Sequence, residues 1–188
     1  MATMQETYQM LENATLWETA VECRRVLDEA TIPHAIVGGV AVALHGYQRN
    51  TVDLDLLIRS EDQPRVRQAM EAAGFVWQAD QAEFRSPAGA IVQFVISGTP
   101  AGKDSQVKLP DPADPATVTQ RENLSVLSLS RLIESKLACG LGSMRRTHRD
   151  FADVVELISI HQLGRDFARH LHKSLRTTFR KLVEQSRG

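Results

Sequence analysis

The sequence predicts an α/β (α+β) fold, in which a small mixed sheet with helices is followed by a lobe of helices. Three observations lead to this prediction. Strand and helix patterns alternate through residues 1–97, residues 98–123 carry several prolines and little periodicity, and residues 124–188 consist mainly of apolar stripes at helical spacing. We therefore expect an α/β domain with an N-terminal helix over 1–97, a Pro-rich connector over 98–123 and a helical C-terminal lobe over 124–188.

Within the first segment, the spacing of apolar residues sets the expected elements. Leu16, Ala20 and Leu27 lie on one stripe of a helix, which Pro33 ends. Ser60 favours the start of another helix and Gly74 favours its end. The expected elements are helices over 6–30, 39–44 and 60–73, strands over 35–37 and 51–58, a strand from 75, and a hairpin of 83–85 with 90–96.

The last segment is expected to hold a short strand over 124–127 and then three helices. Thr147 and Asp150 resemble a capping box, so we expect the second of these helices to start near Thr147. Apolar residues recur at helical spacing from Phe167 to Leu182, which predicts one continuous third helix. The expected ranges of the three helices are 128–139, 147–161 and 165–185.

The composition excludes several classes of protein. The two cysteines, Cys23 and Cys139, lie far apart in predicted helices, a spacing that gives no disulfide framework and no zinc motif. No apolar run approaches the roughly 20 residues that cross a bilayer, and residues 1–6 lack the basic and apolar regions of a signal peptide. We therefore expect a cytoplasmic protein with no membrane partner.

Charge is unevenly distributed along the chain, although the formal net charge of its 188 residues is only −1. Residues 145–188 contain 10 Lys and Arg against 5 Asp and Glu, whereas residues 1–144 contain 12 against 18. A basic C-terminal lobe beside an acidic N-terminal one would attract polyphosphate or nucleic acid. An ordinary solvated helix surface explains the same pattern equally well.

Two aspartates two residues apart are the most informative motif. Side chains alternate along a strand, so Asp53 and Asp55 project from the same face. Paired carboxylates repel each other, and a divalent cation that prefers oxygen ligands, Mg²⁺ (or Mn²⁺), relieves that repulsion. Upstream, Gly38 and Gly39 offer backbone N–H groups that a phosphate can approach closely. A phosphate site beside a metal-binding carboxylate pair indicates nucleotide chemistry.

The order and spacing of these motifs resemble the polymerase-β-like nucleotidyltransferase superfamily. Gly38-Gly39 is followed after thirteen residues by Asp53-Leu54-Asp55-Leu56. The run from Arg49 to Asp55, the later 127–138 stretch with Lys136, and Arg149-Asp150-x-x-Asp153 are similar to minimal nucleotidyltransferases and AbiE-type toxins in particular. The resemblance covers roughly residues 33–160.

The resemblance implies a nucleotidyltransferase-fold domain that moves a nucleoside monophosphate from an NTP to an acceptor and releases pyrophosphate. By this likeness Gly38 and Gly39 hold phosphates, Asp53 and Asp55 bind the metal, and Lys136 approaches the phosphates. Four further residues were also considered. Arg49 is expected to reach a phosphate, Arg149 to contact phosphate or pair with Asp153, Asp150 to be a helix-start residue and His45 to be structural.

The chain departs from the family pattern at the third carboxylate, where Val92-Gln93-Phe94 replaces a hydrophobic-Asp-hydrophobic run. Gln93 cannot act as a base or as a strong Mg²⁺ ligand. If strands 83–85 and 92–94 pair, Glu83 falls opposite Gln93 and supplies the missing carboxylate. We therefore include Glu83 among the expected catalytic residues.

Other functions fit parts of the same pattern. The loss of the third carboxylate favours a catalytically degenerate binding protein, for example a toxin–antitoxin component with a protein partner. Metal-dependent glycosyltransferases use a similar Asp-x-Asp pair, although this pair comes early and the chain is small for them. The aspartates could also simply be exposed at a strand end. For a transferase, the NTP and the acceptor stay open, and the acceptor is a small hydroxylated molecule, a protein side chain or a tRNA end.

Overall fold

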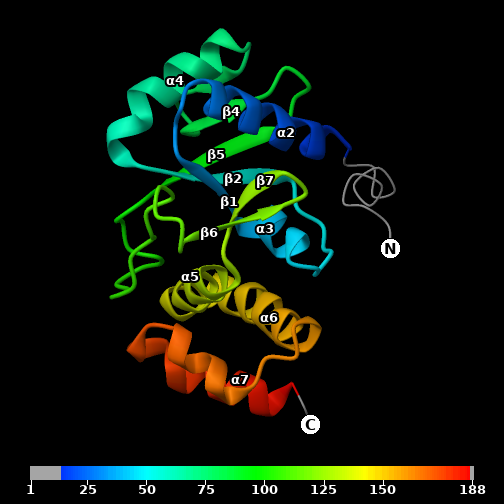
Figure 1. Cartoon of the computed structure of the whole chain (residues 1–188), viewed down its shortest axis with the longest axis vertical. Coiled ribbons are helices and arrows are strands. Elements are labelled where there is room, and N and C mark those ends of the chain that lie inside the picture. The colour runs from blue at the N-terminus through cyan, green and yellow to red at the C-terminus, as the bar shows by residue number, and fades with distance from the viewer. Residues whose placement is uncertain (1–13, 187–188) are drawn as a thin grey trace.

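A computed structural model describes residues 14–186 of the chain (Figure 1). Its first described helix, α2 (Ala14–Glu29), confirms the described part of the helix predicted over 6–30, whose first residues lie outside the described range. The mixed α/β class is confirmed, because seven strands form one sheet that contains both parallel and antiparallel neighbours. None of the helices in this range combines the length and the apolar character that crossing a bilayer requires.

The sheet has the strand order β3-β4-β5-β2-β1-β7-β6. At its centre β1 pairs antiparallel with β2, while β2 pairs parallel with β5 and β1 pairs parallel with β7. The strands are β1 (His34–Val37), β2 (Asp53–Ile58), β3 (Val76–Gln78), β4 (Glu83–Arg85), β5 (Ile91–Ile96), β6 (Val118–Arg121) and β7 (Leu124–Leu127). All four residues of β1 are buried, as its position in the middle of the sheet requires.

Strands from all three predicted segments belong to this one sheet. β7 was predicted as the start of the helical lobe, but it lies directly beside β1. β6 lies within the segment that was predicted as a connector, and it pairs antiparallel with β7. Glu122 and Asn123 join these two strands with φ angles of 46° and 64°, the backbone of a tight hairpin turn. The strand pattern of β6 is short and polar, so periodicity alone did not reveal it.

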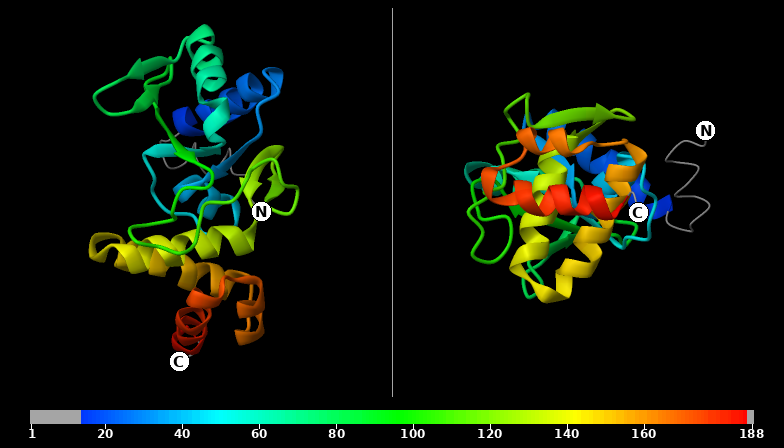
Figure 2. Two further views of the ribbon diagram at one scale, coloured as in Figure 1. Left: turned by 90° about the vertical axis from the view of Figure 1, so that its left-hand side faces the viewer. Right: turned by 90° about the horizontal axis from the view of Figure 1, so that it is seen from below.

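Helices flank the sheet and extend from it on one side (Figures 1 and 2). α2 and α4 (Gln63–Ala72) contact each other and cover one part of the sheet, and α3 (Gly38–Leu44) packs on β1 and β2. α5 (Leu129–Gly142) and α6 (Met144–Ile160) pack together, and α7 (Arg176–Gln185) contacts α6. The stack of α5, α6 and α7 lies at the opposite end of the molecule from α2 and α4.

Two of the predicted helix boundaries are wrong. α6 begins at Met144, and the Thr147 hydroxyl donates to the carbonyls of Gly140 and Ser143 rather than capping a helix start. The predicted helix over 165–185 is regular only in α7, because the first half forms two 3₁₀ turns, Arg165–His170 and Lys173–Leu175. Leu171 between them has an extended backbone, which interrupts the helix although the apolar spacing continues.

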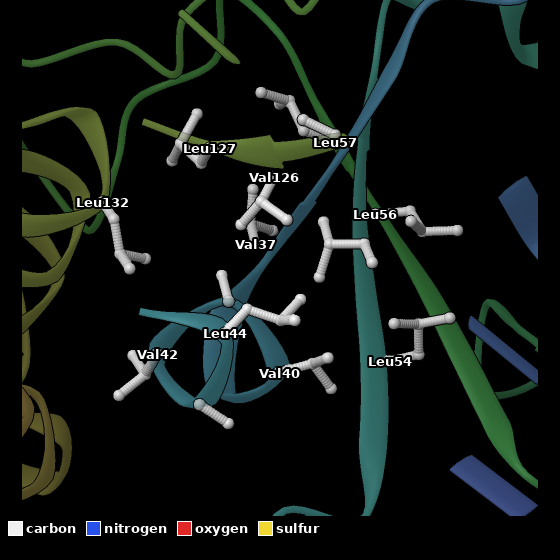
Figure 3. Packing of buried hydrophobic residues seen from close by; sticks show 14 of the residues in the cluster. Val37, Val40, Val42, Leu44, Leu54, Leu56, Leu57, Val126, Leu127 and Leu132 are labelled. Atoms are coloured by element: carbon white, nitrogen blue, oxygen red, sulfur yellow. The ribbon is translucent and has the colours of Figure 1, made fainter. Parts of the chain in front are cut away.

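The core lies between the central strands and the helices on either side of them (Figure 3). Val40 and Leu44 of α3 lie near Val37 of β1, and Leu132 of α5 belongs to the same buried cluster. Along β2, Leu54 and Leu56 point to one side of the strand. This alternation leaves Asp53 and Asp55 on the other side, as the sequence predicted.

Residues 97–109, which we call the cavity loop, fold back on themselves and pack against α5. Its two arms are joined by backbone hydrogen bonds between Gly98 and Leu109 (2.8 Å) and between Ala101 and Val107 (2.8 Å). Gly102 lies so close to α5 that a Cβ there would be 2.7 Å from the carbonyl oxygen of Ala138. The loop is therefore fixed on α5, where it forms one side of the cavity described next.

Candidate functional site

A cavity of about 410 Å³ lies between the sheet, the cavity loop and helices α5 and α6. This volume is within the range of small-molecule sites in proteins. The sheet side and α3 contribute Val37, Gly38, Gly39, Asp53, Asp55, Val95 and Ile96; the cavity loop contributes Thr99, Pro100, Ala101, Gly102 and Leu109; the remainder are Arg49, Ser135, Lys136, Cys139, Arg146, Arg149 and Asp150. The cavity therefore brings together six of the seven residues that the sequence singled out, all except Glu83.

On the sheet side, Asp53 and Asp55 both face the cavity from β2. Among the described residues, neither carboxylate has a basic partner within ion-pair distance, and Asp53 accepts only a hydrogen bond from the Thr51 hydroxyl (3.2 Å). Burial raises the pKa of the Asp55 carboxyl, and the nearby negative charge of Asp53 raises it further. Two carboxylates held together without a counter-charge are poised to bind a cation.

The glycine pair lies directly against these carboxylates. Val37 of β1 is the register partner of Asp55, so the next residue, Gly38, starts α3 beside the Asp55 side chain. A Cβ on Gly38 would be 1.9 Å from the Asp55 Oδ2 atom, and Gly38 has a φ of +65°, which favours glycine. A Cβ on Gly39 would be 2.5 Å from the Thr51 hydroxyl. No side chain fits at either position, so the backbone itself forms the cavity wall there.

On the helix side, four charged side chains form a closed cluster, in which three are buried and Arg49 is partly exposed. Arg49 donates two hydrogen bonds to Asp153, at 2.6 and 3.0 Å. The Lys136 ammonium lies 2.9 Å from Asp150 and 2.8 Å from Asp153. Lys136 is 8 % exposed and Asp153 is 1 % exposed, so these pairs are largely desolvated. The cluster joins α5 and α6 to the segment that leads into β2.

The structure corrects two interpretations of the neighbouring residues. Asp150 is not a helix-start residue, because it lies well inside α6 and pairs with Lys136. Its other oxygen, Oδ2, is buried and has no hydrogen-bond partner among the described residues. Arg149 does not pair with Asp153, whose carboxylate is held by Arg49 and Lys136. Both errors arose because a sequence shows neighbours on one helix but not the charges that another helix presents.

Arg146, Arg149 and Cys139 are cavity residues for which sequence reasoning gave no firm role. Arg146, Arg149 and Asp153 recur at helical spacing along α6, a signal that could have placed them on one face. Cys139 is half-buried, and burial raises the pKa of its thiol. The thiol is therefore a modest nucleophile, but it offers a chemical probe at the cavity wall.

Glu83 lies where the predicted pairing places it. β4 and β5 pair antiparallel with Phe84 opposite Val92, so Glu83 falls opposite Gln93, and the Gln93 amide donates to the Glu83 carboxylate at 3.3 Å. Gln93 is in turn the register partner of Asp55 on β2. Asp55, Gln93 and Glu83 therefore form a row across three strands, with Glu83 buried two strands away from Asp55 and outside the cavity lining.

The carboxylates of Asp53 and Asp55 fit a divalent cation that prefers oxygen ligands and takes only some of its ligands from the protein. Among residues 14–186, no group of three His, Cys, Asp or Glu side chains is arranged to hold a metal ion. Asp53 and Asp55 supply carboxylate oxygens in the cavity beside the glycine backbone, whereas Asp150, which also lines the cavity, is paired with Lys136. Mg²⁺ tolerates such a site, since it keeps waters and takes substrate phosphates as further ligands.

Residues 20–110 match the family model described as aminoglycoside-2''-adenylyltransferase. This range contains the glycine pair, both aspartates, Gln93 and the cavity loop, but it ends before α5 and α6. No curated protein sequence matches the chain significantly.

Solved structures with the same architecture include the antibiotic-resistance factor ANT(2'')-Ia. Its solution structure gives a TM-score of 0.53 at 12% identity over 91% of this chain and 92% of that one. Its crystal structure with adenylyl-2''-tobramycin gives 0.50 at 16% identity over 89% and 96%. JHP933 from Helicobacter pylori gives 0.50 at 20% identity over 81% and 70%. At these identities the likeness concerns the fold.

Proposed function

We propose that the chain is a nucleotidyltransferase of the polymerase-β-like superfamily and that it transfers a nucleoside monophosphate from an NTP to a hydroxyl-bearing acceptor in this cavity. The observation that carries the proposal is the uncompensated pair Asp53 and Asp55, packed directly against the Gly38 backbone. This pair combines a cation site with a backbone surface that a phosphate can approach. The AbiE-type subgroup and the cytoplasmic location stay predictions.

Asp53 and Asp55 would hold Mg²⁺ (or Mn²⁺) through their carboxylates. When bound, such an ion neutralises phosphate charge and stabilises the oxygens of an in-line displacement. The raised pKa of Asp55 supports this role, because burial and the charge of Asp53 both disfavour its carboxylate form and a nearby cation would stabilise that form. The chain's own contribution is to keep both carboxylates on one face of β2, where no described side chain neutralises them.

Gly38 and Gly39 would present backbone N–H groups to the phosphates. Both glycines line the cavity, and neither position has room for a Cβ. Arg49 and Lys136 were assigned to the same phosphates, and both line the cavity as expected. Their charges are already paired with carboxylates, which limits how strongly they can attract an anion.

Glu83 is the carboxylate we propose for activation of the acceptor, since it shares a row with Asp55 and contacts Gln93. Because Glu83 is buried two strands away from Asp55, the acceptor proton would reach its carboxylate through a bridging water. A direct test follows from this geometry. Gln93→Asp would put a carboxylate one strand from Asp55, where the superfamily pattern has one.

The acceptor we favour is a small molecule with free hydroxyl groups. The structural neighbour ANT(2'')-Ia was solved with adenylyl-2''-tobramycin, a small hydroxylated molecule that carries a transferred adenylyl group. The cavity here has an apolar side formed by Val95, Ile96 and Leu109 beside its charged sides. Protein side chains and tRNA ends are the alternative acceptors.

The first experiment is isothermal titration of ATP, GTP, CTP and UTP with and without Mg²⁺, followed by incubation with the α-³²P-labelled form of the NTP that binds. We expect Mg²⁺-dependent binding by the wild-type chain, label transfer and pyrophosphate release. Asp53→Ala/Asp55→Ala should abolish binding. Glu83→Gln should keep binding and lose transfer, whereas Gln93→Asp should transfer at least as fast as the wild type. Retained transfer by Glu83→Gln would remove Glu83 from the mechanism.

Gln93 also supports a second candidate function, a catalytically degenerate protein that binds a nucleotide or a protein partner, for example in a toxin–antitoxin pair. Gln93 occupies the position next to Asp55 and bears no charge. This reading predicts nucleotide binding without label transfer in the wild type and transfer only after Gln93→Asp. Absence of binding to any NTP by the folded chain would exclude the nucleotide-dependent forms of both functions.

A further inference from the structure

The charged residues on the helix side of the cavity fall into two groups. Arg49, Lys136, Asp150 and Asp153 pair with one another and are mostly buried. This cluster has two positive and two negative side chains, so its net charge is zero. Seen from the cavity, a neutral cluster offers little long-range attraction to an anion.

Arg146 and Arg149 form the second group. They lie three residues apart on α6, are exposed and line the cavity. Neither forms an ion pair with a described residue. Both line the same cavity as Asp53 and Asp55. They are thus cations that reach the cavity without a carboxylate already attached.

We propose that Arg146 and Arg149 bind the β- and γ-phosphates of the nucleotide, and the pyrophosphate after transfer, whereas Arg49 and Lys136 chiefly hold the two helices to the sheet. This assignment rests on the proposed nucleotidyl transfer. It adds Arg146 as a phosphate-binding residue and selects phosphate over Asp153 as the partner of Arg149; both arginines lie on α6, outside the range of the family match. It also gives a different role to Arg49 and Lys136, the two cations that the sequence assigned to phosphate.

The competition for hydrogen bonds explains this division. A phosphate that draws Lys136 or Arg49 away must displace carboxylates that lie 2.6–3.0 Å from their nitrogens. Moving Lys136 leaves Asp150 without its described ion-pair partner, and moving either cation leaves Asp153 with one partner in place of two. Both changes are unfavourable for buried carboxylates. Arg146 and Arg149 can turn toward a phosphate from solvent at no such cost. The guanidinium group also matches phosphate oxygens with two parallel N–H donors.

The test compares variants that each remove one positive charge. Arg146→Gln, Arg149→Gln and Arg49→Gln are titrated with inorganic pyrophosphate plus Mg²⁺, and with the NTP that binds, and their thermal unfolding is recorded. We expect each α6 variant to lose affinity about tenfold with an unchanged melting temperature. Arg49→Gln should instead lower the melting temperature by several degrees and lose less affinity.

A charge-matched control removes two exposed lysines that do not line the cavity. Lys173→Gln/Lys181→Gln has the same net charge as Arg146→Gln/Arg149→Gln, and both lysines are exposed. We expect the control to bind Mg-pyrophosphate within about twofold of wild type at 0.15 M salt, because charges beyond the Debye length are screened.

The outcomes separate this inference from the proposed function. Equal binding by wild type and Arg146→Gln/Arg149→Gln would overturn the arginine assignment alone. A larger affinity loss in Arg49→Gln than in either α6 variant, at an unchanged melting temperature, would reverse it in favour of Arg49. A folded wild-type chain that binds neither NTP nor pyrophosphate would overturn the proposed function, and the arginine assignment with it.

Discussion

The two sides of the cavity differ in whether their charged side chains have ion-pair partners. On the sheet side, Asp53 and Asp55 stand together with no described cation partner, and the pKa of Asp55 is raised. On the helix side, Arg49 and Lys136 are each bound to carboxylates at hydrogen-bond distance. The chain thus leaves two negative charges unbalanced in one place and balances buried charges in the other.

This difference separates residues that serve a ligand from residues that serve the fold. Two neighbouring carboxylates without ion-pair partners lower the stability of the fold, and a bound cation relieves this cost. The presence of such a pair therefore indicates cation binding. A balanced buried cluster is sensitive to the loss of any one member, because the partner is left charged and desolvated. Sequence motifs do not distinguish these two situations, since both consist of conventional site residues.

The largest expected effect is on the helix side. Among the described residues, Lys136→Met leaves Asp150 with no ion-pair partner and Asp153 with only Arg49, so we expect the free energy of unfolding to fall by about 3–5 kcal/mol. Urea unfolding followed by circular dichroism measures this change. The exposed Lys181→Met is the control and should change it by less than about 0.5 kcal/mol. If Lys136→Met lowers the free energy of unfolding by less than about 1 kcal/mol, the charged cluster on the helix side does not stabilise the fold as proposed.

The matching change on the sheet side should act on binding and not on folding. We expect Asp53→Asn/Asp55→Asn to weaken Mg²⁺-dependent NTP binding at least about 100-fold, or about 2.8 kcal/mol. The melting temperature without metal should be unchanged or higher, because the neutral amides remove both the cost of burying the Asp55 charge and its repulsion from Asp53. Titration calorimetry measures the NTP affinity, and differential scanning calorimetry measures the melting temperature. A lower melting temperature with intact binding would show that the pair is structural.

Gly38→Ala should have an intermediate effect. Its Cβ would meet the Asp55 carboxylate, and its φ of +65° is unfavourable for alanine, so we expect a loss of about 2–3 kcal/mol in unfolding free energy. Gly89→Ala is a control with a positive φ of +92° and nothing within 4 Å of the added atom, and it should cost about 1 kcal/mol. If the two variants lose the same amount, the close contact with Asp55 does not matter.

The smallest effect is a pH dependence from His45, the buried residue at the C-terminal end of α3. Burial lowers the pKa of His45, although its ring bonds the Leu127 carbonyl at 2.8 Å. The unfolded state therefore binds the proton more readily, and stability falls as the pH drops below about 6.5 toward the lower folded pKa. His45→Gln should flatten this slope, and the exposed His148→Gln should not. Denaturant titrations between pH 5 and 8 test this, and an unchanged slope in His45→Gln would assign the effect to another group.

Much of the sheet side could be predicted from the sequence because its signals are local. The alternation along residues 53–58 placed Asp53 and Asp55 on one face, and β2 confirms the strand. The hairpin prediction also placed Glu83 opposite Gln93, since register follows from a short turn. The order of these motifs was sufficient to indicate the superfamily.

The helix side depends on contacts that no local pattern reports. Asp153 binds Arg49 across 104 residues of sequence, and this pairing decides that Arg149 is left facing the cavity. The same holds for β7, which joins β1 across the whole first segment. The sequence by itself determined the strand that carries the carboxylate pair and the backbone that fits against it. Only the tertiary structure decided which charges are neutralised, because buried ion pairing depends on which helices and loops meet in space.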